Sequence, residues 1–421
     1  MTGTVRMAVT LAVFAAMLVL MVVRPRRWSE AWWTMLAASA MLALGLVSPH
    51  DALGVILSGK NALLFLLSLL VGKSGFFDWA AIRCARVARG DAHSLYRNAF
   101  VAGAIITAIL SLDTTAVMLT PVLLALVKRL KVPAAPYVVL CAFVANVGSL
   151  ALPISNLTNL LFADAFHQTF AAFAARMLVP QLVALAATYA ILRWHFRRDL
   201  PRRFDLEPLP EPASVVQSPG YFLICIAVLG AVLIGYFVAP LVGFEPYVFA
   251  FAGSAVLAVA GVLARRVRMH AVREIAWDLF PFVIGLFIAV QGLENLGIVG
   301  VESGWLQTMR AGSPERIFAA AGATAFASNI MNNLPAALIA RSVLLRSHAH
   351  MGTVLAALVG ADVGPMVTPF GSLATMLVLA FARRDGVEVR TGRLVLLGLW
   401  AAPVIVALTA LTLALSFVLV R

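Results

Sequence analysis

The chain has 421 residues, of which 62% are hydrophobic and only 12% are charged. Soluble domains carry about 25% charged residues, so this composition excludes a soluble globular protein and indicates a polytopic membrane protein. The net charge of +13 does not indicate nucleic-acid binding, because the basic residues fall in short loops between apolar segments, where they orient a membrane protein. The three cysteines, Cys84, Cys141 and Cys225, lack the spacing of a disulfide framework or a metal site.

The first apolar run, 7–23, is followed by Arg24, Pro25, Arg26 and Arg27 rather than by a small-residue cleavage site. We therefore predict a retained membrane helix and not a signal peptide. About 20 apolar residues are needed to cross the hydrocarbon core of a bilayer. By that measure we predict ten spans, at residues 7–23, 31–48, 60–77, 134–163, 174–194, 220–240, 246–264, 279–299, 351–382 and 394–420.

Two further segments, 98–127 and 317–345, are apolar at both ends and polar in the middle. Each could be one long helix or a re-entrant hairpin. With two hairpins and the amino terminus outside, most of the basic clusters fall on the cytoplasmic side, as the positive-inside rule requires. A crossing at 98–127 would instead place Lys128, Arg129 and Lys131 outside. We therefore predict two hairpins in a multi-pass protein of the inner (plasma) membrane, with both termini outside.

Two fifteen-residue stretches, 146–160 and 362–376, read almost the same. Without a gap, Val147, Gly148, Pro153 and Leu157 of the first align with Val363, Gly364, Pro369 and Leu373 of the second, 216 positions further along. Both stretches lie in the longest spans, and repeated helix breakers at membrane depth are typical of secondary transporters built from two halves. Proline kinks without a ligand are the plainer alternative.

We predict an all-α polytopic membrane protein with two inverted repeats, in which broken helices meet two re-entrant hairpins near the midplane. The first repeat is predicted at 1–194, a cytoplasmic linker loop at 195–218 and the second repeat at 219–421. Each half contains an odd number of crossings, so the second half is inserted upside down, which is the basis of alternating access.

Two acids, Asp113 and Asp362, lie deep in apolar surroundings. A charge at the centre of a membrane helix costs roughly 2.5–3.5 kcal/mol on insertion scales, so such residues tend to be functional. Burial favours the neutral carboxylic acid, and a carboxyl group that gains and loses a proton suits a proton-coupled carrier. Asp113 and Asp362 are therefore candidates for proton coupling. The structural alternative is that each acid caps the start of a half-helix.

The remaining polar groups in the hairpins and broken spans are hydroxyls and amides, with neither Arg nor Lys within the repeated motifs. This mixture suits a neutral, hydroxyl-bearing solute or an anion held by half-helix N-termini, and it does not favour a soft metal ion. Some of these residues could instead serve only to join helices. The candidate substrate-binding residues are Thr114, Thr115, Asn146, Ser149, Ser155, Asn156, Asn159, Asn329, Asn332, Asn333, Thr368, Gly371 and Ser372.

The sequence shows no HExxH, P-loop or dinucleotide fingerprint. We therefore expect no enzymatic activity, no cofactor and no catalytic metal. The motifs Ser-Gly-Phe-Phe-Asp-Trp-Ala-Ala (74–81), Ser-Asn-Leu-Thr-Asn (155–159), Ile-Met-Asn-Asn-Leu-Pro (330–335) and Thr-Pro-Phe-Gly-Ser-Leu-Ala-Thr (368–375) resemble those of the ArsB-type arsenite/antimonite efflux permeases of the ion transporter superfamily. The likeness runs over essentially the whole chain.

The resemblance implies export of neutral arsenous or antimonous acid in exchange for protons, in some members with a separate soluble ATPase subunit. The chain departs from the family pattern at Leu112, where the family has Asn before its Asp, at Asn146, where it has an acid, and at Ala151, where it has proline. The alternative is a sodium- or proton-coupled carboxylate transporter or a sodium/proton antiporter of the same superfamily. An intramembrane enzyme or a channel-like scaffold is a further alternative, against which the inverted repeat stands.

Overall fold

The computed structural model describes residues 3–23, 29–50, 52, 64–244, 246–267, 279–296 and 308–419. Within these residues the protein is helical, and no β-strand occurs beyond an isolated bridge between Asp91 and Arg203. Predictions that rest on Arg24, Arg26 and Arg27, on Arg268 and Arg273, or on the ends of spans 60–77 and 279–299 lie outside the described residues.

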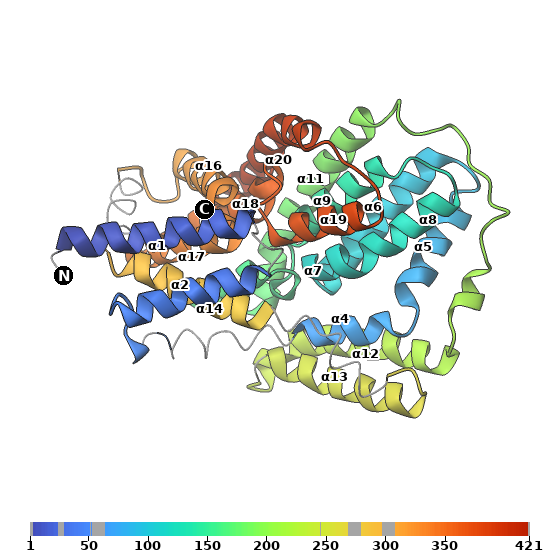
Figure 1. Ribbon diagram of the computed structural model, residues 1–421, viewed down its shortest axis with the longest axis horizontal. Coiled ribbons are helices and arrows are strands. Elements are labelled where there is room, and N and C mark those ends of the chain that lie inside the picture. Colours follow the sequence, from blue (N-terminus) through green and yellow to red (C-terminus); the bar gives the residue numbers. More distant parts are fainter. Residues whose placement is uncertain are drawn as a thin grey trace.

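The first half of the chain runs through a fixed series of elements (Figure 1). Its helices are α1 (Gly3–Val23), α2 (Glu30–Ala43), α4 (Leu64–Gly72), α5 (Phe76–Val87), α6 (Ala92–Ile109), the short α7 (Leu112–Thr114), a π-helical turn (Thr115–Leu119), α8 (Thr120–Arg129), α9 (Ala135–Val147), α10 (Leu157–Ala165) and α11 (Phe170–His195).

The second half follows a loop that contains a 3₁₀ turn at Pro212–Val215. Its helices are α12 (Pro219–Val238), α13 (Pro246–Leu263), α14 (Leu279–Glu294), α16 (Pro314–Met331), α17 (Asn333–Arg346), α18 (Met351–Val363), α19 (Leu373–Arg384) and α20 (Thr391–Leu419). In Figure 1, α1 starts at the left of the molecule and α12 at the right, so the two halves are inserted in opposite directions.

The two predicted broken spans are broken at aligned residues. α9 ends at Val147 and α18 at Val363, while α10 begins at Leu157 and α19 at Leu373. Each break leaves four carbonyls and four N–H groups without helical partners, and polar side chains satisfy several of them. Asn156 caps α10 by accepting from Thr158 N, and Ser372 caps α19 by accepting from Thr375 N.

Both predicted hairpins are present. The first turns at Leu110 and Ser111, between α6 and α7, and the second turns at Asn332, between α16 and α17. Asn332 has a φ of 78° and a ψ of 156°, a backbone conformation that normally requires glycine and is strained for asparagine. Its side chain then caps α17 by accepting from Leu334 N.

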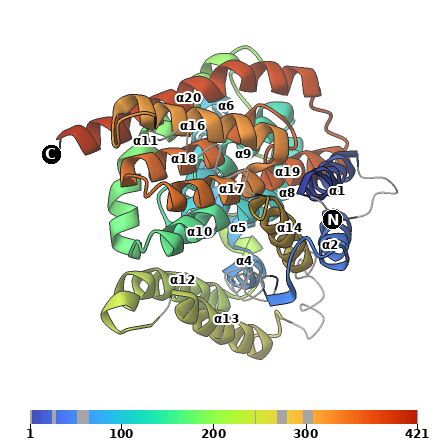
Figure 2. The same ribbon diagram turned by 90° about the vertical axis from the view of Figure 1, so that its left-hand side faces the viewer.

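The third helix of each repeat packs with the first two helices of the other repeat. α14 lies against α1 and α2, and these three helices form the first outer bundle. α4 lies against α12 and α13, and these form the second outer bundle. Figures 1 and 2 both show the two outer bundles at separate edges of a core made of α5–α11 and α16–α20. Each outer bundle is therefore built from both repeats.

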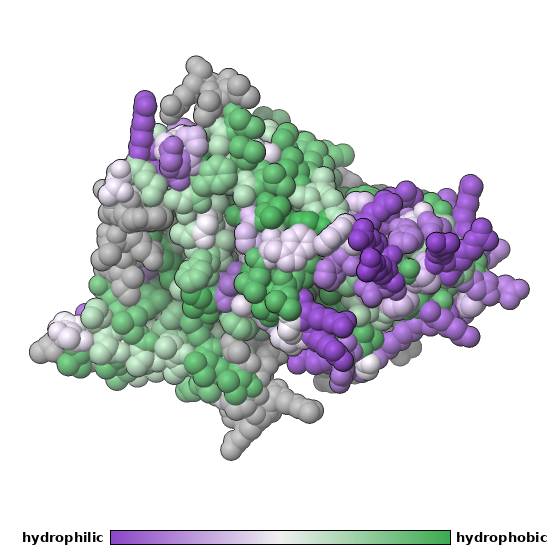
Figure 3. Space-filling model, turned by 90° about the horizontal axis from the view of Figure 1, so that it is seen from above, coloured by the Kyte–Doolittle hydropathy of each residue, from purple (hydrophilic) through white to green (hydrophobic). Residues whose placement is uncertain are grey.

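Among the described residues, five helices are long and apolar enough to cross a membrane alone: α1, α11, α20, α13 and α12 with its short extension to Leu241. The other predicted spans consist of shorter or broken helices. A separate helix, α5, was not predicted, although it buries Phe77, Ala81 and Ala85 at helical spacing. Viewed from above, hydrophilic side chains gather at one end of the molecule, where the loops around α5 and α8 lie, and hydrophobic side chains cover much of the rest (Figure 3).

Candidate transport site

The two breaks are joined by side chains that cross from one repeat to the other. Nδ2 of Asn146, in the last turn of α9, donates to Oγ1 of Thr375 at the start of α19 (3.0 Å). In the opposite direction, Asp362 in the last turn of α18 accepts hydrogen bonds from the start of α10. Asn146 and Asp362 occupy aligned positions, so the pairing is close to symmetric.

Asp362 is fully buried. Its Oδ1 accepts from the hydroxyl of Thr158 at 2.6 Å and from Nδ2 of Asn156 at 3.0 Å. Among the described residues, its Oδ2 is buried without a hydrogen-bond partner. Asp362 therefore does not cap the start of a half-helix of its own repeat; it lies at the end of α18 and faces the first turn of α10, where the helix dipole favours a carboxylate.

Ser149, inside the first break, links the polar residues around it. Its hydroxyl donates to the carbonyl of Asn146 (2.8 Å) and accepts from Nδ2 of Asn156 (3.4 Å), and its own carbonyl accepts from Nδ2 of Asn159 (2.6 Å). Within the described chain, the side-chain oxygens of Asn146 and Asn159 are buried without a donor, as is Oδ2 of Asp362. The first break thus has a surplus of buried hydrogen-bond acceptors.

The tip of the second hairpin is tied to the second break. Nδ2 of Asn329 donates to the carbonyl of Gly364, and its Oδ1 accepts from the backbone N–H of Thr368. Nδ2 of Asn332 donates to the carbonyl of Phe370. The backbone N–H of Asn333 donates to the carbonyl of Gly371. These residues satisfy the unwound backbone, which in hydrocarbon must find protein partners.

The first hairpin is held by hydroxyls. The Ser111 hydroxyl pairs with that of Thr114 at 2.9 Å, and Thr107 pairs with Thr115 at 2.6 Å. The π-helical turn that begins at Thr115 lies at this tip, and π-helical turns often occur at functional sites.

Asp113 lies in the same hairpin tip, half-buried, and no hydrogen bond of its side chain is present among the described residues. The structure thus does not join Asp113 directly to the Asp362 network. Its short helix α7 contacts α9 and α19, which lead into the two breaks, and also α4 of the second outer bundle. The helix caps align Ser111 with Asn332.

Two contacts around the first break involve residues outside the repeated motif. The Ser155 hydroxyl donates to the carbonyl of Ala108, which ties the break to the first hairpin (2.5 Å). Oε1 of Gln181, in α11, accepts from the backbone N–H of Ala151 (2.5 Å). Gln181 was missed by the sequence reasoning, although a lone buried glutamine in an apolar span was a usable signal.

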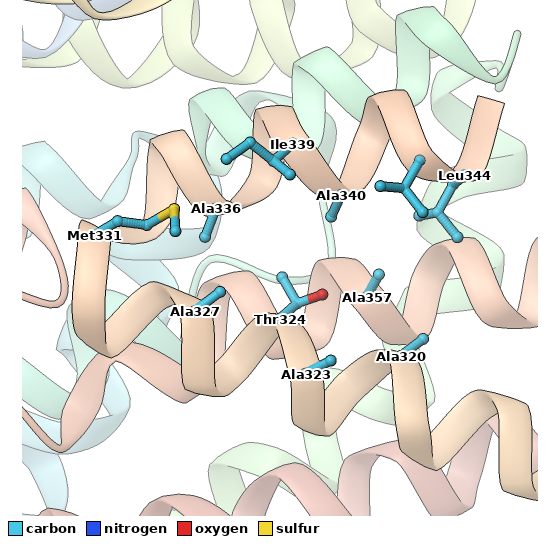
Figure 4. Close-up of a pocket in the computed structure, with 11 residues that line it drawn as sticks. Ala320, Ala323, Thr324, Ala327, Met331, Ala336, Ile339, Ala340, Leu344 and Ala357 are labelled. Atoms are coloured by element: carbon cyan, nitrogen blue, oxygen red, sulfur yellow. The ribbon is translucent and has the colours of Figure 1, made fainter. Parts of the chain in front are cut away.

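Two cavities lie beside the second hairpin. One, of about 190 Å³, lies between the two arms of the hairpin and is lined mainly by alanines, with Thr324 and Met331 (Figure 4). The other, of about 560 Å³, lies between α16, α20 and the second break, where it reaches Asn329 and Thr368. Both cavities lie next to the second hairpin. Two predicted substrate-binding residues, Asn329 and Thr368, line the larger one.

Residues 8–418 match the family model described as the arsenical pump membrane protein. The chain is 31% identical to the arsenical pump membrane protein of Escherichia coli K12, with 97% of this chain and 99% of that protein covered. It is 32% identical to the protein of the same description from Yersinia enterocolitica, over the same shares.

Among solved structures, the chain resembles the YdaH transporter of Alcanivorax borkumensis, which is described as having an unusual topology. The TM-score is 0.55 at 17% identity, and the match covers 88% of this chain and 86% of that one. At this identity the likeness concerns the fold alone.

Proposed function

Because this chain belongs to the arsenical pump membrane protein family, we propose that it exports arsenite and antimonite, as neutral trihydroxy acids, in exchange for protons. The observation that supports this most strongly is the surplus of buried acceptors at the broken helices. Oxygens of Asn146, Asn159 and Asp362 lack donors among the described residues. A solute with several hydroxyl groups supplies such donors, and it needs no charged partner.

Asp362 is the proposed coupling group. The unpaired Oδ2 can either bind a proton or, as a carboxylate oxygen, accept a hydrogen bond from a substrate hydroxyl. Protonation of Oδ2 would therefore weaken the binding of the substrate hydroxyl there. Competition between a proton and the solute at one carboxyl group is the simplest basis for exchange. Asp113 is proposed as a second proton-carrying group, because it is a carboxyl at the first hairpin tip, next to α9 and α19.

The proposed alternating access uses the division between the core and the two outer bundles. Binding at the breaks alters contacts within the core, and inverted repeats supply two related conformations of similar energy. The proposal places the protein in the inner membrane with both termini outside, and with the basic loops on the cytoplasmic side, where a soluble ATPase subunit would dock.

The test is arsenite uptake into inverted vesicles that contain the purified protein, with an imposed proton gradient and with or without sodium. We expect uptake that requires the proton gradient, is abolished by a protonophore and does not respond to sodium. Uptake that requires sodium would favour the sodium-coupled carrier instead. Absence of arsenite movement under every gradient, together with uptake of a carboxylate, would contradict the arsenite proposal.

A further inference from the structure

A polar pocket lies far from the breaks, where α4 leads into α5 and α12 begins. It has a volume of about 240 Å³ and is lined by Lys73, Ser74, Asp78, Gln217, Ser218 and Arg266, together with glycines and Tyr221. It thus joins the end of the second outer bundle, the first turn of α5 and the linker. It also contains Ser74 and Asp78 of the motif 74–81, for which the transport site gives no role.

The pocket is basic. Lys73 and Arg266 contribute two positive charges and Asp78 one negative charge. The guanidinium of Arg266 is held in place by Gln217, whose side-chain and backbone oxygens accept from its two terminal nitrogens (2.5 and 2.8 Å). Its Nε is buried and has no partner in the described part of the chain. The arginine is therefore fixed, with hydrogen-bonding capacity left over.

Two helices also begin at the pocket wall. Gly75 is the N-cap of α5, with a φ of 82°, and Ser218 is the N-cap of α12. Free N–H groups and the helix dipole attract anions to such positions. A side chain at Gly75 would have its Cβ 2.8 Å from the carbonyl oxygen of Val215. The close packing of the linker on α5 therefore needs this glycine and encloses the pocket on that side.

The helices that lead away from the pocket expose apolar side chains to the membrane. Leu223 and Ile226 near the start of α12, and Val259, Val262 and Leu263 near the end of α13, are all exposed. An occupant whose charged group sits in the pocket would have an apolar surface beside it. Basic pockets at the ends of membrane helices of this kind bind phosphate-bearing lipid headgroups.

We propose that the pocket formed by Lys73, Ser74, Ser218 and Arg266 binds a phosphate group, supplied by the headgroup of an anionic phospholipid whose acyl chains lie along α12 and α13. An occupant there contacts the second outer bundle, α5 and the linker at once. It would therefore stabilise the junction between the outer bundle and the core.

The test measures lipid binding to the purified full-length protein in detergent by native mass spectrometry, with phosphatidylglycerol and phosphatidylcholine as the two probes. We expect Arg266→Gln and Lys73→Gln each to weaken phosphatidylglycerol binding by about tenfold, as for loss of one hydrogen bond to a charged group. Asp78→Asn should strengthen binding, because it removes the negative charge. Arg265→Gln is the matched control: Arg265 is the exposed neighbour of Arg266 and does not line the pocket.

Inorganic phosphate distinguishes the two sources of the group. Competition by phosphate at millimolar concentration, lost in Lys73→Gln, would support the site with a soluble anion as its occupant; its absence would support the lipid. Because Arg266 also holds Gln217, its variant is checked for an unchanged melting temperature, and Lys73→Gln gives an independent result. Unchanged phosphatidylglycerol binding in both variants, equal loss in Arg265→Gln, or weaker binding in Asp78→Asn would overturn the proposal.

Discussion

The Thr158 hydroxyl donates a 2.6 Å hydrogen bond to Oδ1 of Asp362, a residue 204 positions further along the chain. This contact joins the first turn of α10, in one repeat, to the last turn of α18, in the other. Asn146 and Thr375 make the corresponding contact in the opposite direction. Hydrogen bonds therefore connect the two broken helices. A substitution at either break should alter the hydrogen bonding of the other.

Thr158→Val should remove the hydroxyl donor to Asp362 while nearly keeping the shape of the side chain. A buried hydrogen bond to a charged group contributes about 1.5–3 kcal/mol, and its loss leaves Oδ1 with Asn156 alone. We expect a lower melting temperature and weaker arsenite transport, measured in detergent and in vesicles. Thr158→Ser keeps the hydroxyl and should retain both the stability and the transport of the wild type. A Thr158→Val protein with the melting temperature of the wild type would show that this hydrogen bond does not stabilise the protein.

Asp113→Asn should abolish proton-coupled transport without unfolding the protein. The Asp113 side chain makes no hydrogen bond among the described residues, so its replacement by the similarly shaped asparagine breaks no such bond and should leave the melting temperature close to that of the wild type. Transport and melting temperature are measured on the same preparations. Asp164→Asn, at an exposed position near the end of α10, is the control. Full activity of the Asp113 variant would remove this residue from the mechanism.

Gly364→Ala should disturb the packing of the second break on α16. A Cβ at Gly364 would lie 2.5 Å from Cα of Ala325, so the backbones would have to separate. Overpacking of this kind costs about 1–3 kcal/mol. Gly322→Ala is the matched control, because a Cβ there meets no atom within 4 Å. The measurement is the melting temperature of both variants. Equal melting temperatures would contradict the close packing of Gly364 on Ala325.

Asn329→Ala should destabilise the second break more than Asn333→Ala. The Asn329 side chain bonds the carbonyl of Gly364 and the N–H of Thr368, and both backbone groups would lose their partner. Leaving a buried group unpaired costs about 1–3 kcal/mol. Asn333, by contrast, ties Gly371 through its backbone N–H, which alanine keeps. Melting temperatures and transport rates of the pair measure the difference; equal stability would mean that the Asn329 bonds contribute little.

Much of the fold could be predicted from the sequence, because helix breakers and apolar lengths are local signals. The aligned Gly148 and Gly364 indicated breaks, and the helices end one residue before each of them. The polar centres of 98–127 and 317–345 indicated hairpins. Helix α5 was missed because its short apolar face follows the end of a longer apolar run, and the exchange of α4 and α14 between outer bundles depends on tertiary packing that no local pattern encodes.

The site was predicted as a set of residue types rather than as a set of contacts. Asp362, Asn146 and Asn156 were candidates because they are polar at membrane depth, and the structure brings them into one network. The partner of Asp362 across the repeats could not be predicted, since sequence spacing gives no distance between α18 and α10. Gln181 was missed because it lies outside both motifs, and Asp113 is not directly bonded to the network it was expected to share.

In the proposed mechanism, the buried carboxyl group of Asp362 couples proton movement to arsenite movement. The most direct measurement follows the pH inside proteoliposomes, with a trapped dye, when arsenite is added to the wild-type protein and to Asp362→Asn. We predict that arsenite movement displaces protons in the opposite direction in the wild type, and that the variant displaces none. Arsenite flux without any proton movement in the wild type, or unchanged coupling in the variant, would show that Asp362 does not couple the two movements.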